Sequence, residues 1–149
     1  MITLESLKGA APFSTTMRTG KRFTHGAVTV VVRFRSATTV KETQEAVRIG
    51  VSIRKKTAKK AVVRNRAKRL LRQSVRQVLG EFDSLGYFAL GCPFEQMIVF
   101  CNTAPKLPSL LRLNEVLSDV REVLVMAIEF YRQRLNRYEN NSHSSRSGL

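Results

Sequence analysis

RKKTAKKAVVRNRAKRLLRQSVR, residues 54–76, contains eleven lysines and arginines and no acidic residue. The spacing of its apolar residues predicts a helix from Lys59 to Leu79 that ends at Gly80. On a helical wheel, a narrow apolar stripe is formed by Val63, Ala67, Leu70, Leu71, Ser74 and Val78. The rest of the wheel is a broad cationic face made of Arg64, Arg66, Lys68, Arg69, Arg72 and Arg76. One side should therefore pack on the protein, and the other should meet a polyanion.

The arrangement of charges distinguishes this helix from an ordinary solvated one. Exposed helices usually mix their signs, because like charges four residues apart destabilise a helix slightly. Here an unbroken i, i+4 series of like charges runs through Lys60, Arg64, Lys68, Arg72 and Arg76. A bound polyanion would relieve this repulsion, so a binding face is favoured over a merely solvated surface. An asparagine, residue 65, lies in the middle of the face and can both donate and accept hydrogen bonds.

The whole chain shares this basic character. Its 149 residues suit one domain, 43% of them are apolar, and the formal net charge is +15 with a pI of about 10.9. Such an excess predicts a polyanionic partner, either nucleic acid or an anionic membrane surface. The basic helix carries Ala67 and Ser74 where a membrane-surface helix would carry bulky apolar side chains, so nucleic acid is the better partner. Composition does not choose between DNA and RNA.

The cellular compartment is predicted from features that the sequence lacks. The first residues, MITLESLKGAAPF, have neither the basic start nor the apolar run of a signal peptide. No uninterrupted stretch of about 18 apolar residues is present, so a soluble, cytoplasmic protein is expected. The two cysteines, Cys92 and Cys101, have no ligand-like spacing and are expected to be reduced packing residues.

The flanking patterns predict an α+β fold, a sheet with helices packed on it. Residues 1–11 are expected to be a loose lead-in, residues 12–138 a single domain, and the polar residues 139–149 a disordered tail. Phe13 and Met17 lie on one face of the first helix. The predicted elements around the basic helix are a short helix at 12–19 closed by Gly20, strands at 27–35 and 47–54, a strand at 97–102 and an amphipathic helix at 110–135.

The basic helix and the segment before it resemble the signature of the bacterial ribonuclease P protein component. That family has a strand leading into a helix that carries AV-x-RNR-x-KR-x-x-R. The matching residues here are Ala61, Val62, Arg64, Asn65, Arg66, Lys68, Arg69 and Arg72. Upstream, Phe13, Gly20 and Lys21 match the family's Phe-x6-Gly-Lys. The resemblance covers roughly residues 4–135.

The resemblance implies a two-layer α/β sandwich in the order αβββαβα, with a four-stranded sheet. It also implies a left-handed crossover at the basic helix, although parallel crossovers are generally right-handed. Residues 12–138 would then be one ribonuclease P protein-like RNA-binding domain. The RNA-subunit-binding residues implied are Arg64, Asn65, Arg66, Lys68, Arg69 and Arg72.

The resemblance also implies a cleft between the sheet and the first helix for the single-stranded 5′ leader of precursor tRNA. Phe13 and Lys21 would lie in this cleft, and Phe13 would stack on a base. Core packing alone is the competing interpretation of Phe13. Ser52 and Arg54 alternate with buried residues of their strand, so they are expected on the same face.

The implied activity is endonucleolytic removal of the leader by a ribonucleoprotein. The RNA subunit would perform the hydrolysis with Mg²⁺, and the chain would contribute no catalytic residue and hold no metal. Its partners would be the catalytic RNA and precursor tRNA, with no membrane and no DNA. The residues agree, because the acids are scattered and His25, His143 and the cysteines have no evident catalytic partner. Glu115, Asp119 and Glu122 share a helix face that is expected to be solvated.

Three departures from the family pattern stand out. The turn before the basic helix is TAKK, residues 57–60, with an extra residue and no glycine. Met17 stands where an aromatic residue is common. The connection 81–96 is long and apolar, and is expected either to cover part of the core or to form an additional contact surface.

Two other functions fit a basic helix on a sheet. A structural RNA-binding protein, such as a ribosomal protein, would need no aromatic-lined groove for a single strand. A sequence-specific DNA-binding protein would usually form a dimer on two half-sites, and the last helix shows no clear dimer heptad.

Overall fold

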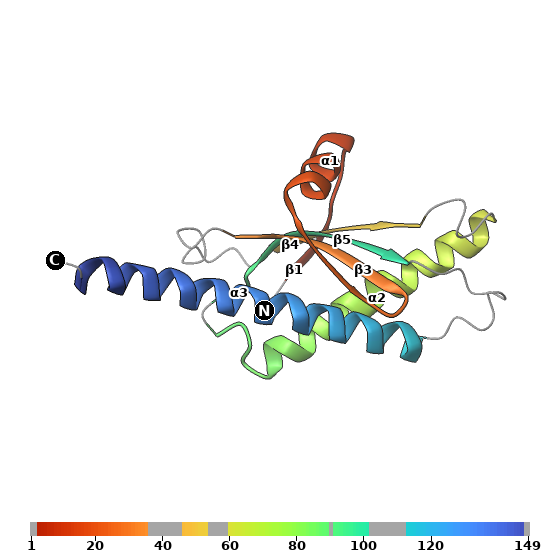
Figure 1. The fold of residues 1–149 in the computed structure, drawn as a ribbon. Coiled ribbons are helices and arrows are strands. Elements are labelled where there is room, and N and C mark those ends of the chain that lie inside the picture. The colour runs from red at the N-terminus through yellow and green to blue at the C-terminus, as the bar shows by residue number, and fades with distance from the viewer. Residues whose placement is uncertain (1–2, 36–45, 54–59, 90, 102–112, 148–149) are drawn as a thin grey trace.

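The computed structural model describes residues 3–35, 46–53, 60–89, 91–101 and 113–147, with side-chain burial in the last helix described for residues 116–137. The chain forms one mixed sheet with three helices packed on it (Figure 1). In chain order they are β1 (Thr3–Ser6), α1 (Ala10–Thr19), β2 (Lys21–His25), β3 (Val28–Phe34), β4 (Ala46–Ser52), α2 (Ala61–Ser84), β5 (Phe94–Cys101) and α3 (Leu113–Ser147). The α+β class and the order αβββαβα are confirmed from α1 onward.

The strands form one mixed sheet in the order β1-β4-β5-β3-β2. β3 is antiparallel to both β2 and β5, whereas β4 is parallel to both β1 and β5. The basic helix α2 therefore connects two neighbouring parallel strands, as a crossover must. Its left hand stays a prediction from the resemblance.

The sheet has five strands, so the expectation of four was wrong. The additional strand β1 comes from the segment that was expected to be a loose lead-in. Its residues pair in parallel with β4 from Thr3↔Ala46 to Ser6↔Ile49, and Leu4 packs against the core. This pairing satisfies backbone groups that β4 would otherwise leave exposed at the edge of the sheet.

The helices divide between the two faces of the sheet. α2 and α3 cover one face and pack against each other, while α1 lies alone on the other face (Figure 1). Between the sheet and the helix pair lies a core built from alternate strand residues such as Val30, Val47 and Met97. α2 buries one stripe toward this core, formed by Ala67, Leu71, Ser74, Val75, Val78, Leu79 and Phe82. The predicted apolar stripe is thus confirmed, with Val63 and Leu70 at its half-buried margin.

α2 runs on to Ser84, so the prediction that it ends at Gly80 was wrong. Gly80 is exposed, and the buried ring of Phe82 gives the last turn a packing partner beyond it. Phe82 and Phe88 lie 6.4 Å apart between ring centroids, and Phe88 and Phe94 lie 6.1 Å apart. The apolar connection therefore covers the end of the core, which is the first of its two expected roles.

The last helix also differs from its expectation. α3 is helical to Ser147, whereas a disordered tail was expected from residue 139. No proline or glycine occurs between Leu113 and Ser147, so nothing in the chain stops propagation, which adds one hydrogen bond per residue. Within the described part of the chain, no helix has the length and apolar character needed to cross a membrane.

Candidate nucleic-acid interface

The cationic face of α2, which we define as Arg64, Asn65, Arg66, Lys68, Arg69 and Arg72, points away from the sheet. Asn65, Arg66, Arg69 and Arg72 are exposed, and the other two are half-buried at its margins. The opposite side of the helix holds the buried stripe, so the helical period alone orients these side chains outward. The structure therefore brings all six predicted RNA-subunit-binding residues together on one surface.

The electrostatic surroundings favour an anion at the first half of α2. No acidic residue occurs from Lys60 to Gly80. The first one, Glu81, receives two charge-assisted hydrogen bonds from Arg121 Nη2 and Nε, at 3.0 and 3.2 Å to Oε2. At the other end, Lys60 is the N-cap and makes no side-chain capping bond. The unbonded N–H groups and the helix dipole add positive potential there.

Val62, one of the motif residues, is a functional candidate that the sequence reasoning passed over. It is 78% exposed in the first turn of α2, next to the cationic face. An apolar side chain so exposed inside an otherwise cationic motif contributes nothing to the core. Its mismatch with the buried stripe is the signal that could have identified it.

On the other face, α1 is fixed to the sheet by a buried polar contact and a close approach. Thr16 is fully buried, and its Oγ1 lies 2.5 Å from the side-chain amide of Gln96 in β5 and 2.9 Å from the carbonyl of Pro12. Gly20 follows the helix where a Cβ atom would lie 2.6 Å from the Thr16 carbonyl oxygen and 2.7 Å from Val31 Cγ1. The glycine is required because only hydrogen fits between α1 and β3.

Two of the four predicted leader-binding residues lie on this same face. Phe13 is half-buried on α1. Ser52 is also half-buried and pairs with Phe100 at the end of β4. Two residues earlier, a Cβ atom on Gly50 would point toward Leu7 and Ile98. Strand alternation gives Ser52 and Gly50 the same orientation. Arg54 lies outside the described residues.

Lys21 does not lie on this face, so its placement beside Phe13 was wrong. Its Nζ is 5.3 Å from the centroid of the Phe130 ring in α3, on the helix-covered face. β2 begins directly after Gly20, and Lys21 pairs with Val32, whose side chain is part of the core. Alternation then turns Arg22, not Lys21, toward the side of α1.

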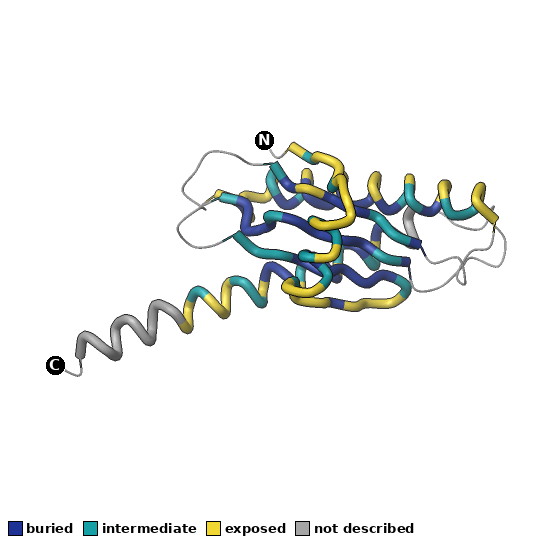
Figure 2. Tube along the Cα trace, turned by 90° about the horizontal axis from the view of Figure 1, so that it is seen from above, coloured by how far each residue is buried: buried dark blue, intermediate teal, exposed yellow. Residues whose placement is uncertain are grey.

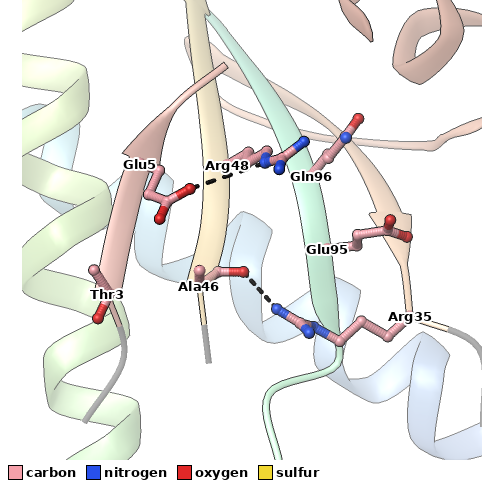
Figure 3. Close-up of a pocket in the computed structure, with 7 residues that line it drawn as sticks. All are labelled: Thr3, Glu5, Arg35, Ala46, Arg48, Glu95 and Gln96. Atoms are coloured by element: carbon pink, nitrogen blue, oxygen red, sulfur yellow. Dashed lines mark hydrogen bonds and ion pairs between the residues drawn. The ribbon is translucent and has the colours of Figure 1, made fainter. Parts of the chain in front are cut away.

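The face that carries α1 is also hollowed near β1 (Figure 3). A hollow of about 550 Å³ is lined by Thr3, Glu5, Arg35, Ala46, Arg48, Glu95 and Gln96. Its cations are matched by acids, because Arg48 Nε lies 3.9 Å from Glu5 Oε2, and Arg33 Nε, nearby, lies 3.8 Å from Glu95 Oε2. The other arginine of the lining, Arg35, donates to the carbonyls of Phe94 and Ala46. This hollow contains none of the predicted leader residues and lacks the cationic excess of α2.

Histidine, acidic and cysteine side chains among the described residues have structural contacts. Across the part of the chain that the structure describes, no three histidine, cysteine, aspartate or glutamate side chains gather to hold a metal ion. His25 Nε2 lies 4.0 Å from Asp119 Oδ1, and Asp119 accepts a hydrogen bond from the backbone N–H of Ala27 at 3.2 Å. Asp119 therefore fastens the β2–β3 turn to α3 and is not simply solvated. Cys92 and Cys101 are both buried in the core, as expected of packing residues.

Comparisons with known proteins agree on one family. A family model described as Ribonuclease P matches residues 1–100. A ribonuclease P protein component from Microcystis aeruginosa is 37% identical over 78 residues, which are 52% of this chain and 62% of that protein. One from Lactobacillus gasseri is 35% identical over 80 residues, or 53% and 66% of the two chains. The matched stretch thus spans less than two thirds of either relative.

Solved structures show the same fold. The RNase P protein of Staphylococcus aureus superposes with a TM-score of 0.54 at 19% identity, covering 82% of this chain and 94% of the other. The protein of Thermotoga maritima gives 0.53 at 21%, covering 83% and 94%. The family model includes α1, the five strands up to β5 and the cationic face of α2. The chain therefore belongs to the ribonuclease P family.

Proposed function

We propose that this protein is the protein subunit of ribonuclease P, which binds the catalytic RNA and assists removal of the 5′ leader from precursor tRNA. The observation that carries the proposal is the cationic face of α2. The buried stripe of α2 packs this helix, including the segment 64–66, against the core. Asn65, Arg66, Arg69 and Arg72 stay exposed. A rigid helix with its cations presented in one direction suits a folded RNA surface.

The cationic face would bind mainly through phosphates. Each phosphate neutralised by lysine or arginine releases condensed counterions, so affinity should fall steeply with salt. The guanidinium groups of Arg64 and Arg66 flank Asn65 and can each bind a phosphate through two parallel N–H bonds. The amide of Asn65 can add a hydrogen bond to a ribose or a base edge. Binding of the RNA would also relieve the repulsion among the like charges of the helix.

The leader would bind on the opposite face of the sheet, beside α1. Phe13 is half-buried, so part of its ring is accessible, and base stacking on an aromatic ring is worth about 1–3 kcal/mol whatever the base. Ser52 offers a hydroxyl on the same face. Mature tRNA lacks the leader, so this contact favours precursor over product and lets product leave.

Hydrolysis is assigned to the RNA subunit, with Mg²⁺ bound by RNA. The described part of the protein gathers no metal-ligand set, and its cations suit a different task. They offset the repulsion between the phosphates of two RNA molecules that must meet closely. The protein would thereby strengthen substrate binding without touching the reacting atoms.

Reconstitution tests this proposal directly. The protein is mixed with a bacterial ribonuclease P RNA at low Mg²⁺, and cleavage of a precursor tRNA is followed, with each component alone as a control. We expect cleavage that requires the RNA and is strongly enhanced by the protein. Tight RNA binding without enhancement would instead identify a structural RNA-binding protein of the same fold.

A further inference from the structure

α3 leaves the core well before it ends. Its buried residues stop at Ile128, and every later residue up to Arg137 is half-buried or exposed. The helix nevertheless continues to Ser147 and projects past the end of the sheet (Figures 1 and 2). A helix that is solvated on all sides gains little from packing, so contacts with a partner would add to its stability.

Between Glu129 and Glu139, the charges of α3 are all positive. Residues 130–137, which we call the α3 arm, read FYRQRLNR, with three arginines and no acid. Arg132, Arg134 and Arg137 are all exposed. Arg134 and Arg137 are three residues apart, so their charges repel each other along the helix. A polyanion would remove this repulsion, as it would on α2.

The root of the arm is fixed by aromatic contacts. Tyr131 stacks on Phe34 of β3, with ring centroids 5.4 Å apart and an interplanar angle of 21°. Phe130 packs edge-on against Phe23 at 5.7 Å. Burial raises the pKa of Tyr131 above its ordinary value, while the nearby charge of Arg134 lowers it. The arm therefore starts from a rigid base, which sets the direction of its arginines.

Cations also flank this root on both sides. Lys21 lies over the Phe130 ring, and the guanidinium carbon of Arg132 lies 5.5 Å from the centroid of Tyr87. Tyr87 itself is 42% exposed. Accessible aromatic rings beside lysine and arginine are the combination by which proteins bind RNA strands, through stacking and phosphate contacts. An apolar protein surface or a neutral lipid bilayer would find fewer complementary groups here, because the exposed side chains are chiefly cationic and polar.

We propose that the α3 arm, with Lys21 beside it, is a second docking surface for the RNA subunit. The inference rests on the proposed function, because it takes the same RNA as the partner. The arm lies on the helix-covered side of the sheet, as does the cationic face of α2, so one large RNA can reach both. The leader surface beside α1 lies on the other side of the sheet and is not part of this contact.

A pair of charge-matched variants tests the proposal in the full-length protein. R134Q/R137Q removes two exposed cations from the arm, and R18Q/R22Q removes two exposed cations from the side of α1. Because the arm variant cannot neutralise two of the phosphates, its binding to the RNA subunit should weaken on the order of tenfold at physiological salt, and its log–log salt slope should shrink by about 1.4. The control should bind as the parent does. Equal weakening in both would overturn the inference, because it would reflect total charge alone.

Photo-crosslinking from exposed glutamines gives an independent measurement. A photoreactive side chain at Gln133 of the arm should cross-link to the RNA subunit at a position different from that reached from Gln73 of α2. Cross-links from residue 73 alone would overturn the arm contact and leave the proposed function standing. Failure at both positions would remove the proposed function itself. If the arm variant binds RNA as the parent does but no longer binds phosphatidylserine vesicles, the arm is a membrane contact and the inference is overturned.

Discussion

Gly20 shows how a single residue sets the site. Its backbone φ of −76° is ordinary, so its importance comes from space and not from a left-handed conformation. The short distances to Thr16 and Val31 mean that α1 and β3 touch through this residue. The position of α1, and with it Phe13, depends on a hydrogen atom in place of a side chain.

Replacing this glycine should therefore be costly, while replacing another should not. Gly20→Ala forces α1 away from β3 and should lower the free energy of unfolding by about 1–3 kcal/mol. Gly80→Ala is the matched control, because no atom lies within 4 Å of its Cβ direction inside α2. Alanine should stabilise that position by about 0.5–1 kcal/mol. Urea unfolding measures both, and equal effects would contradict the close-approach argument.

Phe13 is the residue on which the leader proposal depends most. Phe13→Ala should weaken precursor tRNA binding by the holoenzyme by about 1–3 kcal/mol, because one base no longer has a ring to stack on. Mature tRNA binding should change little, since mature tRNA has no leader. Measuring both dissociation constants on the same preparation provides the control. Equal weakening for the two RNAs would mean that Phe13 is only a packing residue of α1.

At the scale of elements, the two sheet faces carry helices attached in different ways. α2 and α3 are held by a continuous apolar core, whereas α1 is held less extensively, in part by the buried Thr16–Gln96 pair. A buried polar pair is stabilising only while both partners are present, because an orphaned group keeps its desolvation cost. α1 should therefore detach from the sheet more easily than α2 or α3.

Removing one partner of this pair should loosen α1 selectively. Thr16→Val keeps the volume but leaves the Gln96 amide without that partner, which should cost about 1–3 kcal/mol. Hydrogen exchange should rise in residues 10–19 and stay unchanged in α2. Precursor binding should weaken, whereas RNA-subunit binding should remain. Unchanged exchange in α1 would show that its apolar contacts suffice to hold it.

In the molecule as a whole, the sheet separates the two surfaces for which we propose different partners. The cationic face of α2 points outward from one side, and Phe13 with Ser52 lies on the other. A chain with a net charge of +15 would attract RNA to many places. Under the proposed function, separate faces would allow one protein to hold a catalytic RNA and a substrate strand at once.

The salt dependence of RNA-subunit binding measures the size of the first surface. About six phosphate contacts on α2 predict a log–log slope near −4, at roughly −0.7 per contact. Arg64→Ala with Arg66→Ala should flatten this slope by about 1.4 while the far-ultraviolet circular dichroism stays unchanged. A slope near −1 for the parent protein would contradict docking of the whole face. Additional phosphate binding by the α3 arm would make the parent slope steeper.

Elements with a local pattern could be predicted from the amino-acid sequence. Helical periodicity predicted both the buried stripe and the exposed cations of α2, because one period of 3.6 residues fixes them together. Strand alternation predicted the orientation of Ser52 in the same way. The short motif around Arg64, Asn65 and Arg66 was specific enough to indicate the family. Each of these inferences uses residues close to one another in the chain.

Features that depend on partners far away in the chain became visible only in the folded molecule. β1 forms because the edge of β4 is available to Thr3–Ser6, and no pattern within those four residues shows it. The contact of Gly20 with β3 fixes where β2 begins. Because alternate side chains of a strand point to opposite faces, Lys21 then lies on the face covered by α3, over the ring of Phe130. Asp119 fastens a turn 92 residues away in the sequence. Contacts between distant residues depend on how the elements pack, and the local periodicity of a sequence does not specify that packing.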